Sequence, residues 1–436
     1  MRNLLKIVDV CTRVEGHGKV KIYLDNKNEE ITQATFEIEA YRGFEHILKH
    51  KKLCDLPKII SRICGLCHAS QSIASCKTIE NIYGIEPSEQ SILVRKLLMT
   101  GELIKSHSLH FFFQAFPDLL RIFNIHQKIL SPYAIIKNYP QLTTIFFELI
   151  KIGNEIDKIF GGRSVHPITV IPGGVIYNPS KKNITLARKY FQKVLMNLEV
   201  VIERFIELFS KKIPPEEFMI PNPIFLGMHN HGIFDRYSGI LGFKEDNKKI
   251  TNFIEKNYTN YFNKDIDLNG IDFSIGNNIL VGPLARNHIV ESYDIEEVSN
   301  FLSVFDKTWY KNILFTNFIR LLEMYVETFK ALELLNDPLV NKNESLLSLT
   351  NIKNMDGIGV VEAPRGILLH HYHLNKENSI DQIKLFIATE INIPLINHMI
   401  TNYAQKLYEK TDIDTIKKEI QLIIRAFDPC ISCATH

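Results

Sequence analysis

The spacing of apolar positions near the N-terminus alternates with a period of two. Residues 17–24 and 34–40 each place apolar side chains at every second position, and the turn-forming run 25–28 follows the first of them. Alternation of this kind is typical of strands with one buried face. Two such runs joined by Asn- and Asp-rich residues predict a β-hairpin.

After Pro57 the apolar residues recur every three to four positions, which predicts helices. The clearest segment is 184–210, where Ala187, Phe191 and Val194 share one face. The segments with helical spacing are 88–116, 184–210, 312–336 and 394–427. The last of these contains Thr411-Asp412, which can cap a helix N-terminus. We therefore expect two helices there.

These patterns predict a mainly α-helical protein with a small N-terminal β-sheet, an α+β fold with long central helices. We expect one domain over residues 1–436, with a β-rich part at 1–50 and a helical body at 51–436 whose C-terminal end binds metal. Segments 161–183 and 214–245 are rich in Gly, Pro and Asn and are predicted to be loops.

Composition narrows the class of protein. The 436 residues are 45% hydrophobic and 23% charged with a net charge of +2, which gives no electrostatic reason to expect a nucleic-acid partner. No apolar stretch reaches the ~20 residues of a membrane span. The apolar start is too short for a signal peptide and contains Asp9. Seven cysteines in so long a chain do not indicate a disulfide framework, so a cytoplasmic protein is predicted.

Two Cys-x-x-Cys motifs lie near opposite ends of the chain. RICGLC contains Cys64 and Cys67, and DPCISCATH contains Cys430 and Cys433 before ending at His436. Each motif lets two sulfurs bind one ion. Together they offer four soft thiolate ligands.

The cysteines alone leave two kinds of site open. Structural zinc is the common use of four cysteines in a cytosolic protein. Zinc ribbons, however, place their pairs about 15–20 residues apart inside one small module. A thioredoxin-like pair is less consistent still, because no βαβ pattern surrounds either motif. Structural zinc and a reactive metal centre therefore both remain possible at this point.

The residues around the cysteines resemble those of the large, catalytic subunit of nickel–iron ([NiFe]) hydrogenases. The matching stretches occur in family order along nearly the whole chain. They are RVEGH (13–17), YRGFE (41–45), RICGLC (62–67), HSLHFFFQAFPD (107–118), GGRSVHP (161–167), PGG (172–174), VGPLAR (281–286), EAPRGILLHH (362–371), ATEIN (388–392) and DPCISCATH (428–436). The combination of RICGLC, EAPRG and DPCISC is the most specific. The pattern is most similar to the cytosolic multimeric type, and nearest to viologen-reducing alpha subunits linked to heterodisulfide reductase.

The resemblance implies reversible heterolytic cleavage of H2 at a nickel–iron centre whose iron carries CO and CN ligands. By this resemblance, Cys64 and Cys430 are expected to be terminal nickel ligands, and Cys67 and Cys433 are expected to bridge nickel and iron. Cys430 is also the expected proton acceptor, and Glu15 matches the glutamate that passes the proton towards solvent.

Residues around the iron ligands are implied in the same way. Pro364 and Arg365 match a loop that covers those ligands, and Thr389 matches a hydroxyl that donates to cyanide. Asp118 and Asp428 match acids that would hold Arg365 in place, as outer-shell partners do at many metal sites.

A second metal ion is implied at the C-terminus. Glu45, His436 and the backbone carbonyl of Leu385 match the ligands of a buried Mg2+ that stabilises the chain end. Magnesium usually keeps several waters and uses few protein ligands, which agrees with so small a set.

The chain departs from the family at Gln71, where a histidine usually lies near a bridging thiolate. Glutamine can donate a hydrogen bond there but does not titrate near neutral pH. His68, directly after Cys67, either compensates for this change or points away from the metals.

Electrons released by hydrogen oxidation require a second redox centre. Cys11, Cys54 and Cys76 are scattered singly and form no iron–sulfur ligand set. The resemblance implies that a partner protein, the hydrogenase small subunit, carries iron–sulfur clusters. Arg163 and His166 match the surface that faces the nearest of these clusters. Further flavin, ferredoxin-like or heterodisulfide reductase subunits are expected.

Two alternatives compete with the catalytic hypothesis. One is a non-catalytic scaffold subunit with a four-cysteine zinc site, and the other is a quinone-site relative from respiratory complex I, which shares the fold. Those relatives generally lack the four cysteines, and structural zinc has no need of Arg365. The sequence therefore predicts a hydrogenase catalytic subunit.

Overall fold

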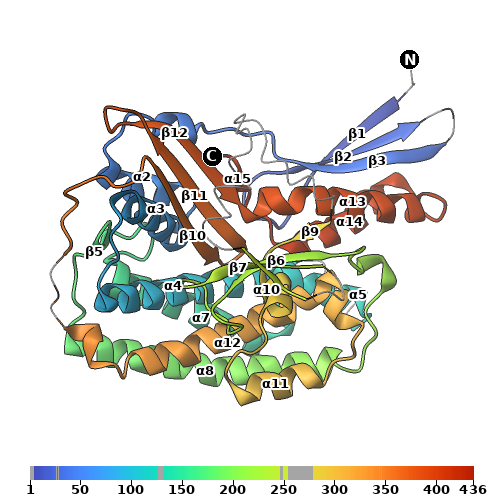
Figure 1. Ribbon diagram of the computed structural model, residues 1–436. Coiled ribbons are helices and arrows are strands. Elements are labelled where there is room, and N and C mark those ends of the chain that lie inside the picture. Colours follow the sequence, from blue (N-terminus) through green and yellow to red (C-terminus); the bar gives the residue numbers. More distant parts are fainter. Residues whose placement is uncertain are drawn as a thin grey trace.

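The computed structural model describes residues 4–436 except 26, 28, 126–130, 246–248, 254–277, 343 and 345. The helices are α1 Phe44–Ile47, α2 Leu56–Ile60, α3 His68–Tyr83, α4 Glu89–Leu109, α5 Phe116–Ile122, α6 Pro132–Asn138, α7 Pro140–Gly161, α8 Lys181–Phe209, α10 Pro283–Ile289, α11 Glu296–Ser303, α12 Thr316–Leu334, α13 Ala388–Tyr408, α14 Ile413–Phe427 and α15 Ile431–Ala434. The strands are β1 Leu4–Val10, β2 Lys19–Asp25, β3 Glu30–Glu37, β4 Val170–Ile171, β5 Gly174–Val175, β6 Ile224–His229, β7 Ile240–Glu245, β8 Thr251–Phe253, β9 Ile279–Leu280, β10 Asp356–Ala363, β11 Gly366–Leu374 and β12 Ile380–Ile387. Figure 1 shows that helices dominate, which confirms the predicted α+β class.

The N-terminal sheet has three antiparallel strands in the order β1-β2-β3. Strands β2 and β3 confirm the predicted hairpin, although β3 begins at Glu30, before the alternating run. Two residues of the predicted turn, 26 and 28, lie outside the described residues. The sheet lies beside α13, where the Phe36 N–H donates to Asn397 Oδ1 at 2.7 Å.

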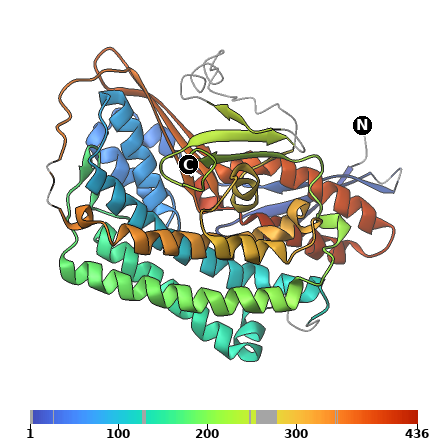
Figure 2. The ribbon, with the colours of Figure 1, turned by 60° about the horizontal axis from the view of Figure 1, so that its bottom comes forward.

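Four long helices, α4, α7, α8 and α12, form the helical body (Figure 2). In α8 the apolar face predicted from the sequence is buried, including Ala187, Phe191 and Val194. The C-terminal segment forms two helices as expected, because Asp412 caps α14 by accepting from the Thr415 N–H at 2.9 Å. Among the described helices, none combines the length and apolar character that crossing a membrane requires.

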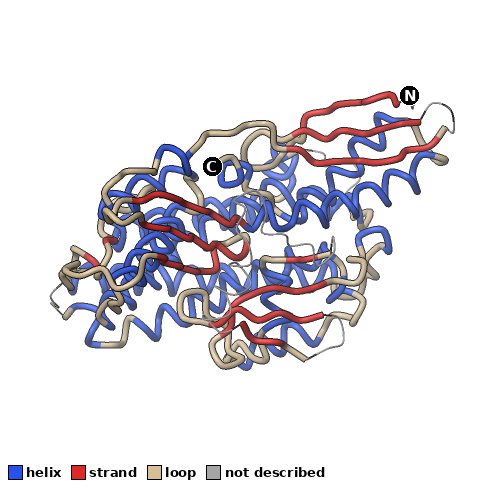
Figure 3. Tube along the Cα trace, turned by 45° about the horizontal axis from the view of Figure 1, so that its top comes forward, coloured by secondary structure: helices blue, strands red, loops and turns tan. Residues whose placement is uncertain are grey.

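Strands in the second half of the chain, absent from the prediction, form further sheets. Figure 3 draws all the strands in red. Strands β10, β11 and β12 form one antiparallel sheet, and β8, β7, β6 and β9 form another sheet in which β9 pairs parallel to β6. The prediction of loops over 214–245 is therefore wrong where β6 and β7 lie. The residues of β6 are almost all buried, so the strand lacks the alternation that identifies a half-exposed strand.

Candidate metal centre

The four cysteine sulfurs of the two motifs meet at one buried point. Cys64 and Cys67 precede α3, while Cys430 and Cys433 lie at and within the short helix α15. All four Sγ atoms lie within 4.8 Å of one another, and all four residues are buried. Figure 1 places the C-terminus and α15 beside the β10–β12 sheet. The fold thus brings together two cysteine motifs that are far apart in the sequence, with Cys64 Sγ 3.3 Å from Cys430 Sγ.

This cluster fits a thiolate-bound metal centre. Burial raises the pKa of the Cys67 and Cys430 thiols, because a buried anion loses its hydration. A bound cation offsets that penalty and favours the thiolate form, and soft thiolates suit transition metals such as nickel and iron. Among the described residues, no other group of three or more His, Cys, Asp or Glu side chains converges in this way.

Arg365 lies in the two-residue turn between β10 and β11, where its charge acts on Cys64 and Cys430. Its Nε donates to the Asp428 carbonyl at 3.0 Å, and its Nη2 lies 2.9 Å from Asp428 Oδ1. Its Nη1 donates to Ser106 Oγ at 3.1 Å. Arg365 is only 5% exposed, so these contacts hold a buried cation next to the cysteines.

Asp118 does not hold Arg365, contrary to the prediction. Its carboxylate pairs with Arg13 and with Arg425, whose Nε lies 2.5 Å from Asp118 Oδ2. Two guanidinium groups therefore neutralise this acid, and it connects the RVEGH segment to α14. Only Asp428 of the two predicted acids contacts Arg365.

Glu15 lies against the C-terminal cysteine motif through both its main chain and its side chain. The Glu15 carbonyl accepts from the Ile431 N–H at 3.2 Å. Its carboxylate accepts from the Ser432 N–H at 3.0 Å and from the Ser432 hydroxyl. The carboxylate is thereby held next to the segment that carries Cys430 and Cys433.

Buried ion pairs support the turn that carries Arg365. Arg286 Nη1 lies 2.7 Å from Glu362 Oε2, and Arg286 Nη2 lies 2.6 Å from Glu323 Oε2. Arg286 Nη2 also donates to the Pro364 carbonyl at 3.1 Å. Sequence patterns assigned no role to Arg286 or Glu323. In the sequence, the only indication of Arg286 was its place in the matching stretch VGPLAR. The only indication of Glu323 was that it is an acid within the apolar helix α12.

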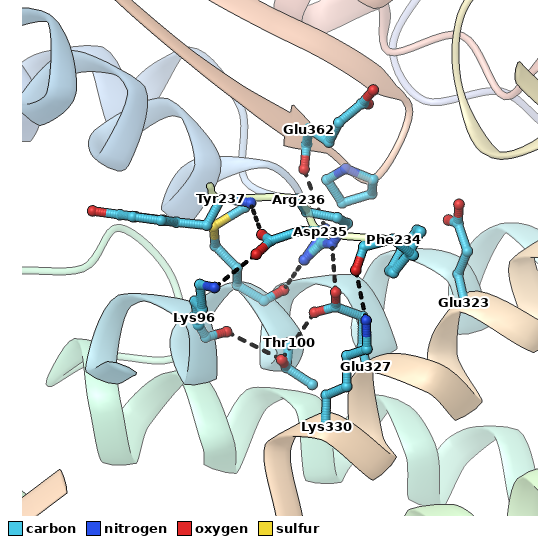
Figure 4. A network of polar contacts seen from close by, with 12 residues as sticks. Lys96, Thr100, Phe234, Asp235, Arg236, Tyr237, Glu323, Glu327, Lys330 and Glu362 are labelled. Atoms are coloured by element: carbon cyan, nitrogen blue, oxygen red, sulfur yellow. Dashed lines mark hydrogen bonds and ion pairs between the residues drawn. The ribbon is translucent and has the colours of Figure 1, made fainter. Parts of the chain in front are cut away.

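A second polar network connects the same strand to the helical body (Figure 4). The Glu362 N–H donates to the Arg236 carbonyl at 2.9 Å. Arg236 Nη2 donates to the Met99 carbonyl in α4 at 2.8 Å, and its Nε lies 3.4 Å from Glu327 Oε1 in α12. Strand β10 is thus connected to two long helices of the body, which fixes the turn at its end.

Glu45 and His436, the two side chains predicted to bind a second metal ion, lie close together at the C-terminus. His436 Nε2 lies 3.5 Å from Glu45 Oε1, and His436 Nδ1 lies 2.9 Å from the Cys433 carbonyl. The Leu385 N–H donates to Glu45 Oε1 at 2.9 Å. Because the N–H and C=O of one residue in an antiparallel strand point to the same side, the Leu385 carbonyl also faces this site.

The remaining predicted side chains around the cysteines separate into two groups. Thr389 Oγ1 accepts from the Cys430 N–H at 2.8 Å and retains its own proton for donation. Gln71 Nε2 lies 3.9 Å from Cys433 Sγ. His68 points away from the thiols, with Nε2 2.9 Å from Lys105 Nζ and 3.4 Å from Asp157 Oδ2.

Behind Gln71 lies His370, a residue to which sequence patterns assigned no role. Its Nε2 is 2.9 Å from Gln71 Oε1. Burial lowers the pKa of His370 to about 3, so the imidazole is neutral.

Arg163 and His166 lie at a surface hollow close to the first cysteine motif. Arg163 is exposed, and His166 Nδ1 lies 2.9 Å from the Ser61 carbonyl, just before RICGLC. The hollow has a volume of about 430 Å³, and Lys58, Arg62 and Ile176 also line it. A basic and partly apolar surface therefore lies beside the metal centre.

Comparison with known proteins identifies the class to which this fold and site belong. The family model of nickel-dependent hydrogenases matches residues 42–131 and 276–436, more than half of the chain. A HoxL-like model matches residues 7–41. The chain belongs to the nickel-dependent hydrogenase family, as its large subunit, and is therefore an oxidoreductase.

Individual relatives cover nearly the whole chain. An F420-non-reducing hydrogenase subunit of Methanothermobacter marburgensis is 28% identical over 98% of this chain and 94% of that protein. The NAD-reducing hydrogenase HoxS subunit beta of Cupriavidus necator is 28% identical over 99% of this chain and 94% of that protein. A solved NAD+-reducing [NiFe]-hydrogenase in the H2-reduced state has a TM-score of 0.87 at 26% identity, covering 99% of both chains.

Proposed function

We propose that this chain is the catalytic subunit of a nickel–iron hydrogenase that interconverts H2 with protons and electrons. The single observation that carries the proposal is the convergence of four buried cysteines, two from each end of the chain, beside the buried Arg365. Membership of the nickel-dependent hydrogenase family supports it. Its direct test is the metal content of the purified complex, together with an infrared spectrum in the CO and CN region. Zinc alone, without those bands, would favour a scaffold subunit.

In this proposal Cys64 and Cys430 would hold the nickel, and Cys67 and Cys433 would be ligands shared by the nickel and the iron. When bound, the metal pair with its CO and CN ligands supplies the redox and Lewis-acid chemistry that splits H2. The chain supplies a buried cradle that excludes water. Arg365 offers a permanently charged, planar donor to an iron ligand, and Asp428 orients it. Thr389 retains a hydroxyl proton for the same task.

Protons leave by a route that begins at Cys430 and continues to Glu15. The support for this step is the position of the Glu15 carboxylate, which Ser432 holds beside the cysteine motif. An isolated parallel β-bridge between Glu15 and Cys430 holds these two segments side by side. The proposed proton donor, Cys430, and the proposed acceptor, Glu15, therefore lie on neighbouring segments.

Replacing Glu15 with glutamine is expected to retain nickel and iron but lower H2 turnover by about 10²–10⁴-fold, the usual contribution of a positioned proton-transfer group. Glutamine can still accept from Ser432, so the local structure should persist. The measurement is H2-dependent dye reduction, normalised to nickel content. The exposed Glu39, paired with Lys19, provides the control Glu39→Gln. Undiminished turnover in fully loaded Glu15→Gln would remove Glu15 from the proton route.

We also propose that Glu45, His436 and the Leu385 carbonyl bind Mg2+. This proposal is supported by the 3.5 Å distance between His436 Nε2 and Glu45 Oε1, which one ion could contact together. Because His436 Nδ1 contacts the Cys433 carbonyl, Nε2 is left available as a ligand. The ion would hold the C-terminal segment against β12. Its role is structural, because it would be bound apart from the four thiols.

Replacing Glu45 with glutamine is expected to reduce magnesium content well below that of the unmodified chain, because the only anionic ligand of the proposed set is lost. Backbone hydrogen exchange of the C-terminal segment should accelerate at the same time. Elemental analysis and exchange mass spectrometry measure both effects. Glu30→Gln, at an exposed glutamate of β3, serves as the control. Unchanged magnesium in Glu45→Gln would place the ion elsewhere.

Electrons are proposed to pass to a small subunit that carries iron–sulfur clusters and docks at the hollow containing Arg163 and His166. The support is that this basic hollow lies beside the cysteine motif. The names of the relatives, which are subunits of larger hydrogenases, point in the same direction. We further propose that the complex contains flavin, ferredoxin-like or heterodisulfide reductase subunits. We also propose that the protein is cytoplasmic and that its chain forms a single domain.

A further inference from the structure

A line of buried polar side chains leads from Cys433 into the interface between α3 and the β10–β12 sheet. Gln71 follows Cys433 at 3.9 Å, and His370 follows Gln71 at 2.9 Å. On the other side of the imidazole, His370 Nδ1 lies 3.1 Å from the Tyr372 hydroxyl, which lies 2.9 Å from the Ser75 hydroxyl. Gln71, His370, Tyr372 and Ser75 are all completely buried, so water does not compete for these contacts.

Because some of these groups can only accept hydrogen bonds, one consistent set of donors and acceptors fits this line of side chains. A thiolate can only accept, so the Gln71 amide must turn its N–H towards Cys433 and its oxygen towards His370. The amide oxygen also only accepts, so the His370 proton must be on Nε2. His370 Nδ1 is then free to accept from the Tyr372 hydroxyl. The Tyr372–Ser75 contact joins two hydroxyls, either of which can donate, so Ser75 can donate to the Tyr372 oxygen when the Tyr372 proton points to His370.

We propose that His370 is a positioning residue that, supported by Tyr372 and Ser75, holds the Gln71 amide with its N–H towards the Cys433 sulfur. An uncharged amide would then donate to this sulfur without titrating near neutral pH. The inference rests on the proposed function, because Cys433 is the sulfur expected to bridge the two metals.

The alternative orientation of Gln71 shows why His370 matters. A flipped amide would place its oxygen against the sulfur, two acceptors facing each other, and would leave both without a donor. Such buried unsatisfied groups are destabilising. Without the imidazole, the Gln71 oxygen would lose its donor, and only the long contact with the sulfur would favour the donating orientation. His68 cannot replace it, because that ring contacts Lys105 and Asp157.

The experiment compares His370→Ala with His371→Ala in the intact hydrogenase complex. His371 is the next residue of β11, and its Nε2 lies 2.9 Å from the exposed carboxylate of Asp356, on the opposite face of the sheet. It is therefore a matched control for the loss of one imidazole. Nickel and iron content is measured first, and the infrared bands of the CO and CN ligands are then recorded.

His370→Ala is expected to move these bands to lower wavenumber, because a sulfur without its donor passes more electron density to the iron. His371→Ala should leave them at their original positions. Gln71→Leu should produce the same shift as His370→Ala, and the double variant should add little, since both changes remove one interaction. A purely structural role for His370 would lower stability without moving the bands.

The outcomes separate this inference from the proposed function. Unchanged bands in fully loaded His370→Ala would overturn the inference and leave the proposed function intact. Absence of any CO or CN band in the unmodified complex would overturn both. If His370→Ala takes up no metal, Tyr372→Phe is compared instead, because it removes one oxygen and keeps the ring. A shift to lower wavenumber in that variant supports the inference, and unchanged bands contradict it.

Discussion

Replacing Cys430 with serine is expected to abolish stable nickel binding and H2 turnover together. A hydroxyl is a harder ligand than a thiolate and does not ionise near neutral pH, so one of four soft ligands is lost. Loss of an outer-shell partner typically costs 10–100-fold in metal affinity or activity, and removal of a direct ligand should exceed that. Elemental analysis and H2-dependent dye reduction on the same sample measure the two losses.

The control is Cys76→Ser, which makes the same chemical change at a buried cysteine outside the cluster. Cys76 lies in α3, is fully buried and is free. It should lose some stability but keep its nickel, because its sulfur is not part of the four-cysteine group. Full nickel loading and turnover in Cys430→Ser would contradict the assignment of this cysteine as a ligand.

Replacing Arg286 with alanine is expected to destabilise the folded chain by about 3–5 kcal/mol, the usual cost of removing one partner from a buried ion pair. Arg286, Glu323 and Glu362 are all 0% exposed, so two carboxylates would lose their buried counter-charge. The support beneath Pro364 would be lost as well. Denaturant unfolding of the purified complex measures the change.

The loss of folding stability caused by Arg286→Ala should be smaller at acidic pH than at neutral pH. In the unmodified chain burial raises the pKa of Glu323, but Arg286, with a smaller contribution from His107, outweighs burial and lowers that pKa to about 2. Without Arg286 burial dominates, so the pKa in the folded state rises above its unfolded value. A raised pKa stabilises the fold below the unfolded pKa, and this contribution disappears as pH rises through the folded pKa.

A surface ion pair supplies the control for this experiment. Arg204→Ala removes an exposed partner of Glu207 one turn away in α8, and such pairs contribute only about 0–1 kcal/mol. Its stability change should be small and nearly independent of pH. An Arg286→Ala effect as small as that of Arg204→Ala would show that the buried pairs contribute little to the support of the turn.

Local sequence patterns predicted the elements that depend on neighbours close in the chain. Alternation identified the hairpin of β2 and β3, and helical spacing identified α8 and α12. The cap at Asp412 correctly divided the last segment, because a cap acts within one turn. Strand β6 escaped detection, since a strand buried along almost its whole length carries no alternation.

The sequence by itself determined the chemistry available to this protein: two cysteine pairs, Arg365 in its loop and a family resemblance along the chain. Only the tertiary structure decided which charged and polar groups meet. Asp118 pairs with Arg425, 307 residues away, and not with Arg365. His370, and not His68, lies behind Gln71. Such choices depend on how distant elements pack, because a hydrogen bond or ion pair selects partners by distance in space, which spacing along the chain does not specify.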